Sequence, residues 1–170
     1  KGQYYSLWHT TAMMRHGADL YIDHPYGSVF TGAIKPTGPE SEEKVTMPEG
    51  EDDITVYLPI FGAIHSFEIG ICEGASLKEH SKPYQNELPI VFYGSSITQG
   101  GCASRPGNIY QNIINRRLDC DYINLGFSGN AKGEPEMVDY IKSLDMSLFV
   151  MDYDYNAPNA AHLAKTHEPF

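Results

Sequence analysis

Leu88-Pro-Ile-Val-Phe-Tyr93 is a continuous apolar run, and the loop Gly94-Ser-Ser-Ile-Thr-Gln-Gly-Gly101 follows it directly. A short run without polar alternation is typical of a strand that is buried on both faces, as in a parallel sheet. Glycines and serines after such a strand predict a tight turn into a helix. There a serine hydroxyl and its backbone N–H face the same space, and substrate can approach the backbone closely.

Strand-like and helix-like segments alternate after this loop. Strands are expected at 121–125 and 147–151, and helices at 106–118, 135–144 and 158–166. This alternation is typical of βαβ units and a parallel sheet. Residues 89–170 therefore predict part of a flavodoxin-like, three-layer α/β domain. In a strand order of 2-1-3, the strand before Ser96 lies in the middle.

The first half of the chain predicts β-structure instead. Strands are expected at 4–9, 19–22, 28–34, 54–60 and 65–71, with Gly and Pro clusters between several of them. Short strands with one apolar face each pack naturally as a small antiparallel sandwich, so residues 1–80 predict a β-sandwich domain. No convincing amphipathic helix precedes residue 100. The polar residues 81–88 predict a linker.

Composition and charge exclude some classes of partner. The 170 residues carry 12 basic and 22 acidic side chains, a net charge of −10. Nucleic acid and anionic membranes need a basic surface, so neither is expected as a partner. No stretch approaches the roughly 20 apolar residues of a membrane span. The first residues lack a secretory signal, yet a signal removed during maturation leaves no trace. The compartment stays open, and a periplasmic or secreted location is compatible with the sequence.

Acidic and sulfur-containing side chains suggest no cofactor. Acidic residues gather at 40–53, which predicts a solvated loop, with a cation site as the alternative. The three cysteines have neither the number nor the spacing of a disulfide framework or a zinc site. Cys72 and Cys120 are expected to be small buried hydrophobes. Cys102 follows the serine loop and is expected to line a pocket there.

Three predicted strands end in loops with polar groups, and function gathers at such strand ends in open α/β sheets. Taken singly, Ser96, Gly129 and Asn156 fit a chain turn, a βα turn and a helix cap. Asp152 and Asp154 allow a metal pair as a further alternative, although no nearby ligand completes it. Adjacent strands lie about 4.8 Å apart. We therefore expect the three loops to converge on one small volume, as an oxyanion hole does beside a nucleophile.

The three loops also resemble sequence blocks of SGNH (GDSL-type) hydrolases. The segment 94–97 resembles the G-D-S-L block, with Ser95 where the family usually has aspartate, and 123–129 resembles the second block. The segment 154–156 resembles the third block, G-x-N, with Asp154 replacing the glycine.

This resemblance assigns roles to residues. It implies that Ser96 is the nucleophile and an oxyanion N–H donor, that Gly129 gives a second N–H and that Asn156 gives an amide. The residues expected to bind substrate are Gly94, Ser95 and Cys102.

The first half carries a narrower resemblance. Gly17-Ala-Asp-Leu-Tyr21 resembles the signature of the GxDLY domain, a β-sandwich that precedes GDSL-like hydrolase domains. Tyr57-Leu-Pro-Ile60 is similar to a later strand of that domain. Together the resemblances cover nearly the whole chain.

The catalytic base of the family has no counterpart in these residues. The family supplies it from a D-x-x-H block, which the sequence lacks; His162 and His167 do not match it and predict surface or packing roles. We expect a truncated or cleaved chain whose absent part carries the Asp and His. A base from the first domain is the alternative. An absent C-terminal segment, a partner chain or self-association is expected to cover the open sheet edge.

The resemblance therefore implies a serine ester hydrolase that forms an acyl-enzyme on Ser96. The β-sandwich in front suggests acylated carbohydrate as the substrate. The alternative is a non-catalytic module that binds glycan or protein through a degenerate hydrolase domain. A nucleotide binder is disfavoured, because the serine loop lacks G-x-G-x-x-G spacing.

Overall fold

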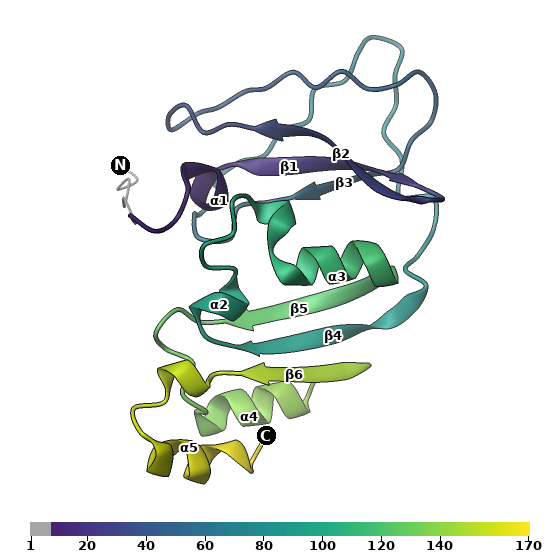
Figure 1. Cartoon of the computed structure of the whole chain (residues 1–170). Coiled ribbons are helices and arrows are strands. Elements are labelled where there is room, and N and C mark those ends of the chain that lie inside the picture. Colours follow the sequence, from purple (N-terminus) through teal and green to yellow (C-terminus); the bar gives the residue numbers. More distant parts are fainter. Residues whose placement is uncertain (1–7) are drawn as a thin grey trace. The chain divides into compact units, whose positions relative to one another are not determined.

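The structure is a computed structural model that describes residues 8–170 (Figure 1). The chain forms two compact units. The first comprises Lys1–Pro83 and Cys102–Asn112, and the second Tyr84–Gly101 and Ile113–Phe170. The first unit thus takes in a segment that begins directly after the serine loop. The domain limits predicted from sequence stay a prediction, because spatial units need not follow sequence domains.

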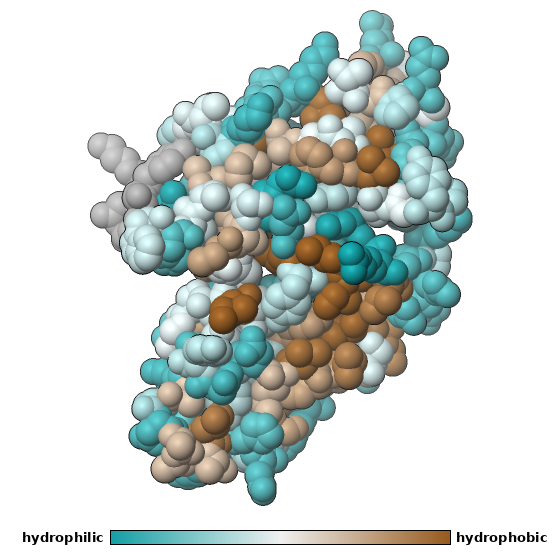
Figure 2. All heavy atoms as spheres, viewed as in Figure 1, coloured by the Kyte–Doolittle hydropathy of each residue, from teal (hydrophilic) through white to brown (hydrophobic). Residues whose placement is uncertain are grey.

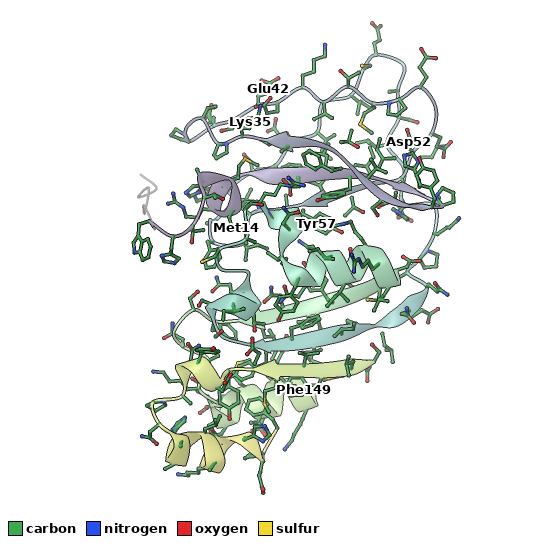
Figure 3. All side chains as sticks on the ribbon, in the orientation of Figure 1. Met14, Lys35, Glu42, Asp52, Tyr57 and Phe149 are labelled. Carbon is green, nitrogen blue, oxygen red and sulfur yellow. The ribbon has the colours of Figure 1, made fainter. Side chains whose placement is uncertain are left out.

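The first unit is built on a three-stranded antiparallel sheet in the order β2-β1-β3. Its elements are α1 (Ala12–His16), β1 (Ala18–His24), β2 (Gly27–Ile34), β3 (Ile54–Tyr57) and the 3-10 helix η1 (Pro106–Asn108). The central strand buries Ala18, Tyr21 and Ile22. Figure 3 labels two further core residues of this unit, Met14 and Tyr57, which are 0% and 8% exposed.

Several expectations for the first half are corrected. The predicted strand at 65–71 is wrong, because residues 58–83 form neither helix nor strand. β3 ends at Tyr57 rather than continuing to residue 60. The short helix α1 precedes residue 100, where no helix was expected; the Thr11 hydroxyl caps it by accepting the Met14 N–H at 3.1 Å. Most of the predicted strand 4–9 lies outside the described residues. The described residues of this unit form one antiparallel sheet, so the predicted β-sandwich is not confirmed.

The sequence motif at residues 17–21 has a clear place in this unit. Asp19 is fully buried on β1, and its Oδ2 accepts the N–H of Gly107 at 2.8 Å. The Nε of Arg105 lies 3.1 Å from the same oxygen, and the Arg105 guanidinium lies 4.1 Å from the ring centroid of Phe30. The motif carboxylate therefore holds the segment that contains η1.

The second unit is a parallel sheet in the order β5-β4-β6, which confirms the predicted order. Its elements are β4 (Asn86–Gly94), α2 (Ser96–Gln99), β5 (Cys120–Gly126), α4 (Pro135–Lys142), β6 (Leu148–Asp152), η2 (Asp154–Asn156) and α5 (Ala160–His167); α3 (Tyr110–Leu118) leads into β5. Residues 90–93 of the apolar run are buried as expected, with Val91 and Tyr93 both 0% exposed in the central strand, whereas Leu88 at its start is exposed. α2 is the second helix that begins before residue 100.

Apolar side chains from α4, α5 and the sheet form the core of this unit. Buried Tyr93, Ala131, Ile141 and Tyr153 make its centre, and Phe149 of β6 packs against them on the side of α4 (Figure 3). Other large apolar side chains stay on the surface (Figure 2); Leu88 is 48% and Leu148 is 53% exposed. In the described sheet, β6 pairs with β4 only and is an edge strand. None of the described helices is both long enough and apolar enough to span a membrane.

Candidate active site

The carboxyl ends of the three parallel strands lie in register. Gly94 at the end of β4 pairs with Gly126 of β5 on one side and with Asp152 of β6 on the other. Ser95 donates its N–H to the Asp152 carbonyl at 2.9 Å, and Phe127 donates its N–H to the Gly94 carbonyl at 2.8 Å. The serine loop is therefore tied by backbone hydrogen bonds to both neighbouring strand ends.

Two glycines allow this close approach. A Cβ at Gly94 would lie 2.2 Å from Thr98 Oγ1 and 2.4 Å from the Asp152 carbonyl oxygen. A Cβ at Gly126 would lie 2.0 Å from the backbone nitrogen of Gln99. Only glycine fits at such distances. The short helix α2 therefore rests directly against the ends of the strands.

Ser96 is the first residue of α2, and its side chain is partly exposed. Ser95 is only 1% exposed, and its hydroxyl accepts the Ile97 N–H at 3.2 Å as the N-cap. The Ser96 carbonyl accepts the Gly101 N–H at 2.6 Å, which closes the turn. Within residues 8–170, no hydrogen bond involves the Ser96 hydroxyl. The cap hydroxyl is thus committed to the helix, while the Ser96 hydroxyl stays available.

The loops after β5 and β6 are joined to each other. Gly129 has a φ of +70°, and a Cβ there would meet nothing within 4 Å. Its turn is closed by the Asn130 N–H, which donates to the Phe127 carbonyl at 2.9 Å. The amide Nδ2 of Asn156, on η2, donates to the same carbonyl at 3.2 Å. The structure therefore brings the loop of Asn156 to the loop of Gly129.

Gln99, the last residue of α2, contacts the loop after β5, and no sequence pattern indicates this contact. Its Oε1 accepts the Ser128 N–H at 3.0 Å and the Ser128 hydroxyl at 2.7 Å. A single glutamine in a polar turn has no periodicity or motif that marks it. The contact depends on the mutual placement of two loops, which a pattern of residues does not encode.

The groups beneath the strand ends are hydrogen-bonded. Thr98 is fully buried and donates to Asp152 Oδ2 at 3.3 Å. The Tyr93 hydroxyl donates to Glu134 at 3.0 Å and accepts the Gly133 N–H at 2.9 Å. Burial raises the pKa of Tyr93 far above its ordinary value of 10.0. The phenol is therefore a neutral donor at every pH at which the protein would be assayed.

The histidines near the third loop lie on α5. His162 Nε2 lies 2.7 Å from the Lys132 carbonyl oxygen, and its backbone N–H donates to Asn159 Oδ1 at 2.8 Å. His167 is exposed at the end of the helix. Across the described residues, no group of three or more His, Cys, Asp or Glu side chains is arranged to hold a metal ion.

The cysteines occupy different environments. Cys120 is buried, as expected. Cys72 is exposed, so the expectation that it is buried is wrong; it lies in the segment 58–83, which has no strand to cover it. Cys102 is exposed with a φ of 67° and belongs to the first unit.

Two comparisons with known proteins found similarities to this chain. Residues 87–168 match the model of the GDSL-like Lipase/Acylhydrolase family. The chain is also similar to the crystal structure of a proposed GDSL-like lipase from Bacteroides ovatus, with a TM-score of 0.86 and 32% sequence identity. That likeness covers 97% of this chain and 49% of the other, so the chain spans about half of its length. No curated protein matches the chain. The chain therefore has a mixed α/β fold with an antiparallel sheet and a separate parallel sheet, and it is similar to GDSL-like proteins in both comparisons.

Proposed function

We propose that the chain carries the nucleophile and the oxyanion hole of a serine ester hydrolase. The observation that carries the proposal is the register of the three strand ends, with Gly94 paired to both Gly126 and Asp152. Because the strand ends are paired, the three loops begin next to one another. The N–H groups of Ser96 and Gly129 and the amide of Asn156 would then bind one developing oxyanion.

The proposed reaction is acyl transfer in two steps. Ser96 Oγ attacks the ester carbonyl carbon while a base accepts its proton, and the tetrahedral intermediate carries its negative charge on the former carbonyl oxygen. The intermediate collapses, the protonated alcohol leaves, and an acyl-enzyme remains. Water then attacks the acyl carbon, and the carboxylic acid departs as Ser96 regains its proton.

The base is proposed to be a histidine oriented by an aspartate, both outside these 170 residues. Two observations support this. His162 is engaged with the Lys132 carbonyl at 2.7 Å, and the chain spans only 49% of the similar Bacteroides ovatus protein. A further stretch of the protein, or a second copy, would also cover the edge strand β6.

The proposed substrate is an acylated carbohydrate, such as a sugar carrying O-acetyl groups. The β-rich first unit supports this proposal, because a sheet domain in the same chain as a hydrolase domain can bind a glycan. If the full-length protein binds glycans without hydrolysing any ester, the non-catalytic module is the better description.

Covalent labelling tests the nucleophile directly. The full-length protein is treated with a fluorophosphonate probe and assayed on chromogenic acetyl esters. Labelling and hydrolysis are expected for the wild type and for Ser143→Ala, a matched variant that loses a helix-end hydroxyl bonded to Tyr140 O. Both are expected to vanish in Ser96→Ala. Persistent labelling of Ser96→Ala, or none in the wild type, refutes the proposal.

The amide donor gives a second test. Asn156→Ala is expected to lower kcat by roughly 100- to 1000-fold, as loss of one oxyanion donor does elsewhere. An equal loss in kcat and kcat/KM would indicate an interaction made only in the transition state. Full activity of a folded Asn156→Ala would remove this residue from the proposed site.

A further inference from the structure

Gln99 bridges the helix that begins with Ser96 and the loop that carries Gly129. Its Oε1 accepts two hydrogen bonds from Ser128, one from the backbone N–H at 3.0 Å and one from the hydroxyl at 2.7 Å. Ser128 immediately precedes Gly129, and Gln99 is the last residue of α2. One side chain thus fixes the peptide next to the proposed oxyanion donor against the helix of the proposed nucleophile.

We propose that Gln99 is a positioning residue that sets the distance between the Ser96 hydroxyl and the Gly129 N–H. The proposal rests on the proposed function and adds to it a residue that need not touch substrate.

The other hydrogen bonds near the loop tip do not reach α2. Gly129 is exposed, and a Cβ there would meet nothing within 4 Å. The backbone N–H of Asn130 and the amide of Asn156 both donate to the Phe127 carbonyl, before the tip. The Asn130 amide donates to the Ser128 carbonyl at 2.7 Å, a contact within the loop that does not reach α2. The tip is held to α2 by the Ser128–Gln99 pair.

The close contact at Gly126 makes the bridge stiff. Because a Cβ there would lie 2.0 Å from the Gln99 nitrogen, the backbone of Gln99 is already seated against the end of β5. The backbone from which the Gln99 side chain extends is therefore held in place. Displacement of a reacting group by about 1 Å can cost roughly 100-fold in rate, so loss of this bridge should act mainly on kcat.

Gln99→Leu removes the acceptor and keeps the approximate volume. In full-length protein that the fluorophosphonate labels at Ser96, kcat is expected to fall roughly 30- to 100-fold while KM changes less than about threefold. Ser128→Ala keeps the N–H donor and is expected to lose less. In the Gln99→Leu background, Ser128→Ala should cause no further loss, because the hydroxyl then has no bridge to lose. Ser143→Ala is the control.

Amide hydrogen exchange gives a readout independent of catalysis. In the Ser96→Ala background, Gln99→Leu is expected to speed exchange of the Ser128 N–H while strand β4 keeps its protection. Unchanged exchange and an unchanged kcat in Gln99→Leu overturn the inference even when the wild type is active. A wild type that is neither labelled nor active refutes the proposed function, and the exchange measurement still decides whether the bridge holds the loop.

Discussion

Removal of the buried carboxylate in the first unit should cost a large part of its stability. Asp19 is 0% exposed, accepts the Gly107 N–H at 2.8 Å and lies 3.1 Å from Arg105 Nε. Asp19→Ala leaves a buried N–H without this acceptor and a guanidinium without its nearest carboxylate. The segment that contains η1 would lose its anchor on β1.

The contacts give the size of the effect. A hydrogen bond to a charged group contributes about 1.5–3 kcal/mol, and breaking a buried ion pair on one side costs about 3–5 kcal/mol. The Arg105 side chain is 31% exposed, so solvent stabilises part of its freed charge. We therefore expect Asp19→Ala to lower the free energy of unfolding by about 3 kcal/mol. Asp19→Asn keeps one oxygen acceptor and should lose about half as much.

Urea unfolding followed by circular dichroism measures this loss, with the same m-value expected for each variant. Asp139→Asn changes an exposed carboxylate on α4 and should stay within about 0.5 kcal/mol of the wild type. The double variant Asp19→Ala/Arg105→Ala should be less destabilised than the sum of the single variants, by about 1 kcal/mol or more. A loss below about 1 kcal/mol in Asp19→Ala, or strict additivity, would refute the reasoning.

Three further perturbations test other contacts. Gly126→Ala places a Cβ 2.0 Å from the Gln99 nitrogen, so α2 must move and ester hydrolysis should fall at least about tenfold; unchanged kinetics would contradict this. Tyr93→Phe removes the donor to Glu134 and should lower the free energy of unfolding in urea by about 1–2 kcal/mol. A urea midpoint equal to that of the wild type would exclude this. Burial lowers the pKa of His16 from its ordinary value of 6.5, so the folded state favours the neutral ring. The contribution of His16 to the free energy of unfolding is therefore complete above pH 6.5 and is lost as the pH falls toward the lowered value. The urea midpoint of His16→Gln should therefore change less with pH between about pH 7 and 5 than the midpoint of the wild type. An unchanged pH dependence of the midpoint contradicts this assignment.

The second unit was predictable because its signals come from burial. An apolar run such as 88–93 needs cover on both faces, and that requirement specifies a central parallel strand. The observed order β5-β4-β6 follows. The first unit was less predictable. The alternation at 65–71 is no weaker than that at 54–57, yet only the latter pairs with β1. Period-two patterning marks a surface that can pair, and whether a partner strand is present depends on the rest of the fold.

The candidate site divides in the same way. The positions of Ser96, Gly129 and Asn156 at three strand ends follow from topology, and the sequence predicts them. The contact of Gln99 with Ser128 depends on how the end of α2 meets an irregular loop, and no periodicity indicates such a contact. Cysteine is commonly buried, which predicts a core position for Cys72, but the irregular segment that contains it leaves it exposed.

The two departures from the resembled hydrolase blocks have a physical account. Ser95 stands where the family usually has aspartate; its hydroxyl accepts the Ile97 N–H at 3.2 Å, and serine and aspartate are about equally good N-caps. The start of α2 is kept, with an uncharged side chain at position 95 in place of a carboxylate. Asp154 replaces a glycine, yet within residues 8–170 only Cys102 and Asp119 are non-glycine residues with positive φ. A side chain at position 154 therefore causes no backbone strain, and η2 can still carry Asn156. Both replacements are compatible with the backbone that the proposed oxyanion hole requires.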